Sequence, residues 1–487
     1  MVHIFGQFGV AATLKLPTFL FIVVVRTYGY MRQLNSDQND RAPIIKSVEL
    51  LKFPYPYEAA LTVASDIDNA SFLRFAAIHS LLCGRGVIRP GSLEWETLGL
   101  TPQSAWYDPA AGGVCGLGFD FADSFFLIGD NVSMGMYRET LKGRFVEDNS
   151  DGYNAAEGIR SWLKSGQIDS FHSFLHYSRD HVLPILEAFY RWCEIEGVTK
   201  PSVWLNHSIG VTPTGLCPQR FRPNRIIRLA RQIARAAIGP ICGRGRSSFR
   251  DGLTWYAGAT PGSKFYINDV LAANGLRYVW LNSNDVFLNR IALPERFYGN
   301  QSSILDVVTM DDGVKYYRFP RCCGVTHTRP GMGYCLRQSE DTCDTSSLFT
   351  RENIESLCRN GGTCILYTHW TLARSFPISD ESIGHFHLVQ QYRDAGRLWS
   401  LPLSKLLEWT ILRTFLKFDV HEDEHTLVID IQCVDDPVFG LNPVTLNDLH
   451  GLSFRVIPRA KQVKMAIAGQ PIEFRHFHCQ DGLCKII

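Results

Sequence analysis

Short apolar runs alternate with amphipathic stretches along the middle of the chain. Residues 58–65 form a continuous apolar run, which is typical of a strand buried on both faces of a parallel sheet. Similar runs recur at residues 125–130, 168–171, 202–207, 277–282, 315–320 and 363–369. Helical patterns lie between or after them, at residues 70–83, 155–164, 180–196, 264–274, 382–396 and 402–415. This alternation predicts a parallel α/β architecture.

The pattern changes after Phe418. Residues 426–433, 453–457 and 463–468 alternate apolar and polar side chains as half-buried strands do, and Pro, Gly and Asn turns separate them. We therefore expect residues 416–487 to form a small all-β domain that resembles a β-sandwich. Such a domain would pack on the α/β part or bind glycan.

The first 55 residues predict an extension followed by a linker. Residues 16–25 are apolar, but this run is shorter than the ~20 residues that a membrane helix needs. It fits a degenerate signal or anchor, or a segment upstream of the fold with Met31 as an alternative start. The polar residues 33–41 indicate the linker.

A basic insertion at residues 219–250 interrupts the alternation. Residues 223–237 within it predict an amphipathic helix whose arginines share one face. An ordinary solvated helix explains the pattern, and the alternative is a dock for an anionic polymer or a membrane surface. Peripheral membrane contact would then run through this helix or through residues 1–30.

Composition narrows the function only a little. At 487 residues the chain suggests roughly 2–4 domains, or one barrel with additions. A formal net charge of +1 gives no attraction to nucleic acid, so we expect no such partner. The 14 cysteines contain no C-x-x-C pair and leave the redox compartment open. We favour the cell envelope or another extracytoplasmic location over the cytoplasm.

Polar residues follow the ends of several predicted strands. These residues are Asp66, Asp68, His172, His207 and His369. Parallel α/β proteins have their active sites at the carboxyl ends of their strands, so the clustering predicts one functional site at that end.

His172 and His176 are candidate metal ligands. Their spacing of four would put both imidazoles on one face of a helical turn, where they can share an ion. A metal held by one carboxylate and two imidazoles leaves room for water and substrate. A second carboxylate would act as general base and a further histidine as general acid. This set suits metal-assisted hydrolysis of an amide or ester.

The order of these motifs resembles the polysaccharide deacetylases, carbohydrate esterases of the chitin-oligosaccharide deacetylase type. His172-Ser-Phe-Leu-His176 matches the second motif of that family. Ala64-Ser-Asp-Ile-Asp-Asn69 stands where the family has Thr-Phe-Asp-Asp-Gly, and Ile365-Leu-Tyr-Thr-His369 resembles the last motif. The resemblance covers residues 56–415 and implies a distorted (β/α)7 barrel.

The resemblance also implies an activity and roles. The chain would be a metal-dependent deacetylase that removes acetyl groups from an N- or O-acetylated polysaccharide or surface glycan. Asp66 would be the base and His369 the general acid. Asp68, His172 and His176 would hold a divalent metal, Zn²⁺ ahead of Co²⁺, Ni²⁺ or Mn²⁺. Ile67 separates the two aspartates, so an exchange of their roles stays open.

Other residues are candidates for the substrate groove. Asn206, His207 and Arg318 are expected to contact substrate. The arginine motif with which the family braces its base has no evident counterpart, and Arg318 or Arg321 would replace it.

Two alternatives remain open. A glycosidase on a related barrel would pair Asp66 or Asp68 with a distant acid, and the candidates are Asp285, Asp311 and Asp312. A non-catalytic descendant would bind glycan or serve as a scaffold.

Overall fold

The computed structural model describes residues 48–487 with gaps. The gaps are residues 68–69, 85–106, 109–112, 115, 130–132, 150–151, 175–176, 207–213, 219–255, 282–303, 322–326, 330–332, 336–348, 369, 371–379, 423–424, 458–461 and 474–475. Several predictions therefore lie outside the described residues: those on Asp68, His176, His207, Asp285, His369, the basic insertion and the N-terminal extension up to residue 47.

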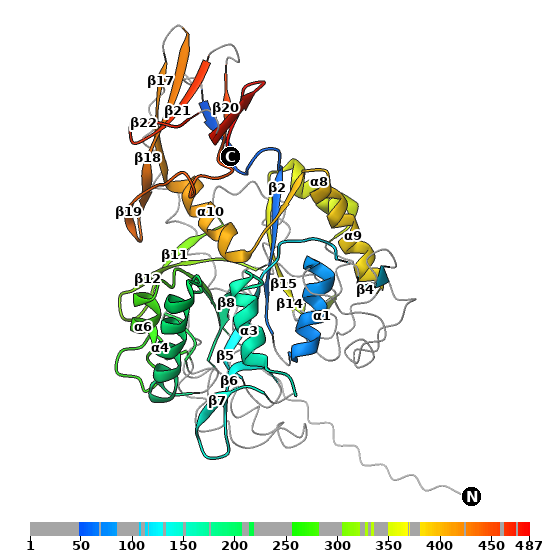
Figure 1. Cartoon of the computed structure of the whole chain (residues 1–487), viewed down its shortest axis with the longest axis vertical. Coiled ribbons are helices and arrows are strands. Elements are labelled where there is room, and N and C mark those ends of the chain that lie inside the picture. Colours follow the sequence, from blue (N-terminus) through cyan, green and yellow to red (C-terminus); the bar gives the residue numbers. More distant parts are fainter. Residues whose placement is uncertain are drawn as a thin grey trace, which may run out of the picture. The chain divides into compact units, whose positions relative to one another are not determined.

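Parallel strands form the centre of the larger sheet, as predicted (Figure 1). Its order is β11 (Asp306–Thr309), β12 (Lys315–Arg318), β10 (Tyr278–Trp280), β9 (Val203–Leu205), β8 (Ile168–His172), β5 (Asp123–Gly129), β6 (Gly135–Glu139) and β7 (Phe145–Glu147). Neighbours from β12 to β6 pair in parallel, whereas β11 and β7 pair antiparallel at the two edges. All predicted strands between residues 125 and 320 are present.

A second parallel sheet is built on β2 (Ala59–Ser65). It lies between β15 (Thr363–Thr368) and β16 (Leu398–Ser400). All seven residues of β2 are buried, as its continuous apolar run predicted.

Side chains connect the two sheets. Among the described residues no backbone ladder pairs β2 or β15 with the larger sheet. The Ser124 hydroxyl of β5 donates to the Ser65 carbonyl at 2.6 Å, and Arg321, beyond β12, donates to the Ala64 carbonyl at 3.1 Å. The larger sheet therefore meets β2 from both of its sides. The described chain is a mixed α/β protein whose ladders do not close into one ring.

Helices follow the strands as expected from the sequence. They are α1 (Phe72–Cys83), α3 (Ala155–Lys164), α4 (Arg179–Glu196), α6 (Asn268–Ala273), α8 (Arg351–Arg359), α9 (Asp380–Asp394) and α10 (Leu403–Phe415). Ser71 and Asn154 cap α1 and α3 by accepting from the Arg74 and Glu157 amides. The predicted helix at residues 264–274 begins four residues late. A turn in which the Tyr266 amide donates to the Ser263 carbonyl occupies its first residues.

The C-terminal residues form two β-sheets. One contains β17 (Leu416–Glu422), β18 (Thr426–Asp436), β19 (Gly440–Pro443), β21 (Gln462–Ile467) and β22 (Gln470–Pro471). The other has the order β1 (Val48–Leu50), β20 (Ser453–Val456), β24 (Leu483–Ile486) and β23 (Phe477–Gln480). Residues 48–50, which were predicted as linker, thus form a strand of this sheet. Two hairpins complete the described strands: β3 (Tyr107–Asp108) with β4 (Gly113–Val114), and β13 (His327–Arg329) with β14 (Gly333–Cys335).

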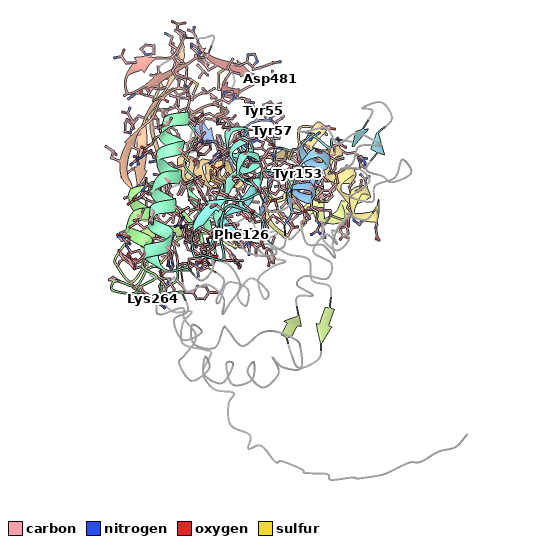
Figure 2. All side chains as sticks on the ribbon, turned by 60° about the horizontal axis from the view of Figure 1, so that its bottom comes forward. Tyr55, Tyr57, Phe126, Tyr153, Lys264 and Asp481 are labelled. Carbon is pink, nitrogen blue, oxygen red and sulfur yellow. A yellow bond between two sulfur atoms is a disulfide. The ribbon has the colours of Figure 1, made fainter. Side chains whose placement is uncertain are left out.

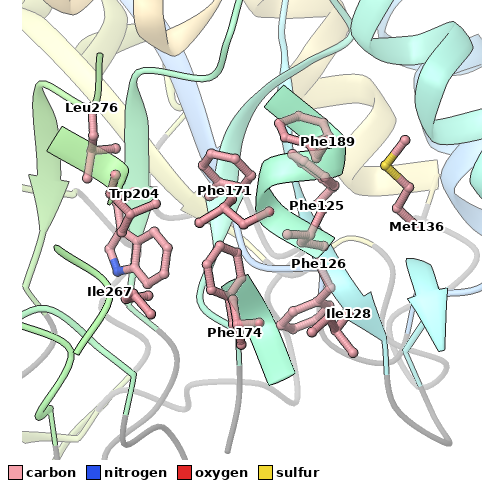
Figure 3. Close-up of a cluster of buried hydrophobic side chains, with 14 of the residues drawn as sticks. Phe125, Phe126, Ile128, Met136, Phe171, Phe174, Phe189, Trp204, Ile267 and Leu276 are labelled. Carbon is pink, nitrogen blue, oxygen red and sulfur yellow. The ribbon is translucent and has the colours of Figure 1, made fainter. Parts of the chain in front are cut away.

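Aromatic side chains fill the core beside the larger sheet (Figure 3). The Phe171 and Phe174 rings pack edge to face at 5.7 Å, and Phe174 meets Trp204 in the same way at 4.9 Å. Phe125 lies 5.2 Å from Phe171 on the neighbouring strand. Packing of this kind explains aromatic side chains in the core, and no bound ligand is needed to explain them.

None of the described helices combines the length and the apolar character that crossing a membrane requires.

Candidate functional site

Asp66 lies at the carboxyl end of β2. Its backbone amide donates to the Thr368 carbonyl at 2.9 Å, so the ends of β2 and β15 are held side by side. Asp66 is only 4% exposed. A carboxylate this deeply buried needs a charged partner to be stable.

Arg321 supplies that partner. Its Nη1 lies 2.5 Å from Asp66 Oδ1, and its Nη2 lies 3.3 Å from Oδ2. Arg321 is itself 3% exposed. A two-point ion pair of this kind fixes the plane of the carboxylate as well as its position.

Two aromatic rings enclose the Arg321 guanidinium. Its Cζ lies 3.4 Å from the centre of the Trp280 ring and 3.9 Å from that of Tyr367. The rings face each other at 6.2 Å with an angle of 23° between their planes. Trp280 of β10 and Tyr367 of β15 thereby position the Arg321 guanidinium through cation–π contacts on both of its faces.

Of the two arginines proposed to brace the base, Arg321 makes the contact with Asp66. Arg318 lies on β12 and donates to Asp306 at 2.9 Å on the antiparallel neighbour β11. The sequence offered no sign of Trp280 and Tyr367 as neighbours of the arginine. Both residues lie near the ends of predicted strands. That position is the one signal in the sequence that could have indicated them as site residues.

His172 is the last residue of β8 and is fully buried. It therefore lies on a strand end rather than on the helical turn that its spacing from His176 predicted. Its ring packs 4.7 Å from Phe126 of β5, and the following Ser173 amide donates to the Leu205 carbonyl of β9 at 3.0 Å. Neighbours on both sides thus fix where this imidazole lies.

Asp66 follows β2, His172 ends β8, and β5 contacts both strands. The Ser124 hydroxyl of β5 bonds to the residue before Asp66, and Phe126 of β5 is the register partner of His172. Both residues lie at carboxyl ends, so they belong to the same rim of the sheets. Within the described ranges no group of three His, Cys, Asp or Glu side chains is arranged to hold a metal. Asp68 and His176 are outside those ranges.

Asn206 follows β9, and its amide holds a neighbouring segment. Its Oδ1 accepts from Trp204 Nε1 at 2.7 Å and from the Leu216 amide at 2.9 Å, while its Nδ2 donates to the Leu216 carbonyl at 2.6 Å. Asn206 is 1% exposed. These contacts give Asn206 a structural role at the rim.

Replacing Asn206 by Ala is expected to destabilise the protein by about 2 kcal/mol. The change leaves the Trp204 indole N–H and both backbone groups of Leu216 buried without their partner. Urea unfolding measures the loss, and Asn360→Ala, which alters an exposed amide just after α8, is the matched control. Equal effects of the two variants would contradict the structural role.

Two of the acids proposed for a glycosidase are among the described residues, and both lie away from Asp66. Asp311 and Asp312 are in the turn that precedes β12, at its amino end, whereas Arg321 and its partner Asp66 lie beyond its carboxyl end. Asp312 accepts from Tyr266 Oη at 3.1 Å and from Asn268 Nδ2 at 2.8 Å. Neither residue shares the rim with Asp66.

Comparison with known proteins adds little. No family model and no curated protein matches the chain. A candidate polysaccharide deacetylase from Mycobacterium smegmatis aligns over 77% of this chain and 100% of its own, with 14% sequence identity and a TM-score of 0.30. That TM-score carries no argument about chemistry, so the site rests on its own geometry.

Proposed function

We propose that this chain is a metal-dependent hydrolase that removes acyl groups, acetyl above all, from an N- or O-acetylated glycan. The two parallel sheets would together correspond to a distorted (β/α)7 barrel of the polysaccharide deacetylase type. The observation that carries the proposal is the buried ion pair of Asp66 with Arg321 at the carboxyl end of β2. It stands where the motif order places the catalytic base.

Asp66 would take a proton from the attacking water. The closer contact of Arg321 is to Oδ1 at 2.5 Å, and the 3.3 Å contact to Oδ2 is weaker. An ionised carboxylate is a hydrogen-bond acceptor, and the proton of the water would pass to one of its oxygens. Arg321 holds the carboxylate in one orientation during this step, since its own planar group is fixed between two rings.

Asp68, His172 and His176 would hold the metal. One carboxylate and two imidazoles form a donor set that suits Zn²⁺ with positions left for water and substrate. The role suits His172 because this residue ends β8 at the rim and its ring packs on Phe126 at 4.7 Å. When bound, the metal would make its water more acidic and polarise the acyl carbonyl.

His369 would protonate the leaving nitrogen or oxygen. The residue before it, Thr368, accepts from the Asp66 backbone amide at 2.9 Å. This bond holds the end of β15 next to the base, as an acid–base pair on one substrate requires.

Acetate release from acetylated chitin oligosaccharides and acetylated xylan tests the proposal. We expect release with Zn²⁺ that chelation abolishes and metal restores. His172→Ala and Asp66→Asn should each reduce the rate by about 10²–10⁴-fold. Lys164→Ala, which alters an exposed ion pair with Glu196 at the end of α3, is the control and should retain the rate.

Three outcomes would overturn the proposal. One is cleavage of glycosidic bonds without acetate release. Another is acetate release that Asp66→Asn leaves unchanged. The third is the absence of hydrolysis and of bound metal in a folded protein, which would favour a non-catalytic glycan-binding descendant.

A further inference from the structure

A cavity of about 650 Å³ lies far from Asp66, at the amino ends of β2 and β15. Glu58 and Gly361, which precede these two strands, are among its lining residues. β2 is seven residues long, so its two ends are about 20 Å apart. The volume falls within the range of about 300–1,000 Å³ that small-molecule sites occupy.

One wall of the cavity is the turn of residues 54–57. The Tyr57 amide donates to the Pro54 carbonyl at 2.8 Å. The C-terminal sheet holds the turn from outside, because the Tyr55 amide donates to Ser453 Oγ at 3.0 Å and Lys485 Nζ donates to the Tyr55 carbonyl at 2.9 Å. The wall is therefore in place before any ligand arrives.

A second wall is the turn between β23 and β24, with Asp481 and Gly482 at its tip. A disulfide joins Cys479 and Cys484, which are register partners on these two strands. The Val456 amide of β20 also donates to the Gly482 carbonyl at 2.7 Å. A site with two fixed walls loses little conformational entropy when it binds.

The lining offers flat aromatic surface. Tyr55 is 47% exposed, and Tyr57 stacks on Trp399 at 6.0 Å with 15° between the planes. Figure 2 shows Tyr55, Tyr57 and Asp481 gathered in one region of the molecule. Tyrosine combines an apolar ring face with a polar hydroxyl. The C–H face of a pyranose ring matches the first and its hydroxyls match the second.

Charge adds a preference for an anion. Lys52, Arg359 and Arg455 stand against Glu58 and Asp481 among the lining residues. Arg397 already holds Glu58 through contacts of 2.9 and 2.8 Å, and Glu49 accepts from Arg455 at 2.6 Å. Lys52 and Arg359 then stand against Asp481, so positive charge remains in excess.

Lys52 is the most constrained of these cations. Its Nζ donates to the Gly361 carbonyl at 2.6 Å. Burial, together with the nearby charge of Arg413, lowers the pKa of Lys52 to about 8. A carboxylate in the cavity would stabilise this ammonium.

We propose that this cavity is a second glycan site, which binds an acidic sugar such as a uronate without acting on it. The aromatic rings would carry the sugar face, and Lys52 and Arg359 would face its carboxylate. This site is separate from the rim at Asp66, and binding there does not depend on hydrolysis.

Calorimetric titration of the full chain with tetragalacturonate, and with neutral maltotetraose as the comparison, tests the inference. We expect saturable binding of the acidic tetramer and at least tenfold weaker binding of the neutral one. Tyr55→Ala and Arg359→Ala should each weaken the acidic tetramer about tenfold, because both side chains line the cavity.

Two control variants have matched chemistry. Arg351→Ala alters an exposed arginine at the other end of α8, and Tyr153→Ala removes a ring that stacks on Phe72 outside the cavity. Both should bind like the wild type.

The inference fails if the acidic tetramer does not bind, if the neutral one binds equally well, or if Tyr55→Ala and Arg359→Ala leave the affinity unchanged. Acetate release is measured separately, so such a failure leaves the proposed hydrolase standing, and a failure of the hydrolase leaves this site standing.

Discussion

Replacing Arg321 by Leu is expected to lower the free energy of unfolding by about 3–5 kcal/mol, the usual cost of leaving a buried charge without its partner. The change removes both contacts to Asp66, which is 4% exposed. It also removes the cation held between Trp280 and Tyr367. The rate of acetate release should also fall in this variant, because the Asp66 carboxylate loses its fixed orientation. Denaturant unfolding and the acetate assay measure the two effects.

Arg318→Leu is the matched control for this variant. Arg318 is also an arginine paired with an aspartate, but Asp306 is largely exposed, so we expect a loss below about 1 kcal/mol. Arg321→Lys keeps the charge and loses the planar two-point contact, and it should fall between the two. If Arg321→Leu were no more harmful than Arg318→Leu, the ion pair with Asp66 would not hold the rim together.

The stability of the protein should decrease between pH 6.5 and about 9 through His79. This residue of α1 is fully buried, with its Nε2 3.5 Å from Asp123 Oδ2 and its Nδ1 3.7 Å from Cys83 Sγ. Burial alone would lower the pKa of His79. The Asp123 carboxylate and the Cys83 sulfur outweigh it and raise that pKa to about 9.

The sign of the pH effect follows from that upward shift. The folded state binds the His79 proton more tightly than the unfolded state, in which the pKa is about 6.5. The stabilisation is therefore complete below pH 6.5 and disappears as the pH rises through 9. Its size is about 3 kcal/mol for a shift of this order.

Unfolding of the wild type and of His79→Gln at several pH values measures this contribution. We expect the difference in stability between the two proteins to shrink by about 3 kcal/mol from pH 6 to pH 9.5. Groups that do not contact His79 titrate alike in both proteins and cancel in the difference. A difference that stays constant over this range would mean that His79 is neutral in the folded protein.

The strands of the α/β part could be predicted because each carries its own signal. A run of buried residues such as 58–65 needs no knowledge of its neighbours to be recognised, and β2 occupies all but the first of its residues. The strand β1 has no such signal. Its three residues are a strand only because β20, some 400 positions later, pairs with them.

Some residues of the site could also be predicted from local sequence, whereas others depend on contacts between distant segments. Asp66 and His172 could be predicted, because each follows a recognisable strand. The choice between Arg318 and Arg321 could not. It depends on β11 standing beside Arg318 and on Trp280 and Tyr367 flanking Arg321, and these are contacts between distant segments. The assignments of Asp68, His176 and His369 remain predictions from the motif order.

The seam between the two parallel sheets has a consequence for motion. Each sheet keeps its own backbone ladders. Side chains such as Ser124 and Arg321 bond across the seam, and the Met134 amide before β6 donates to the Ala70 carbonyl after β2. Regions that open separately are usually divided where few backbone bonds cross. Asp66 stands on one side of this boundary and His172 on the other. Through its bonds to the Ala64 carbonyl and the Asp66 carboxylate, Arg321 connects the two sheets at the rim.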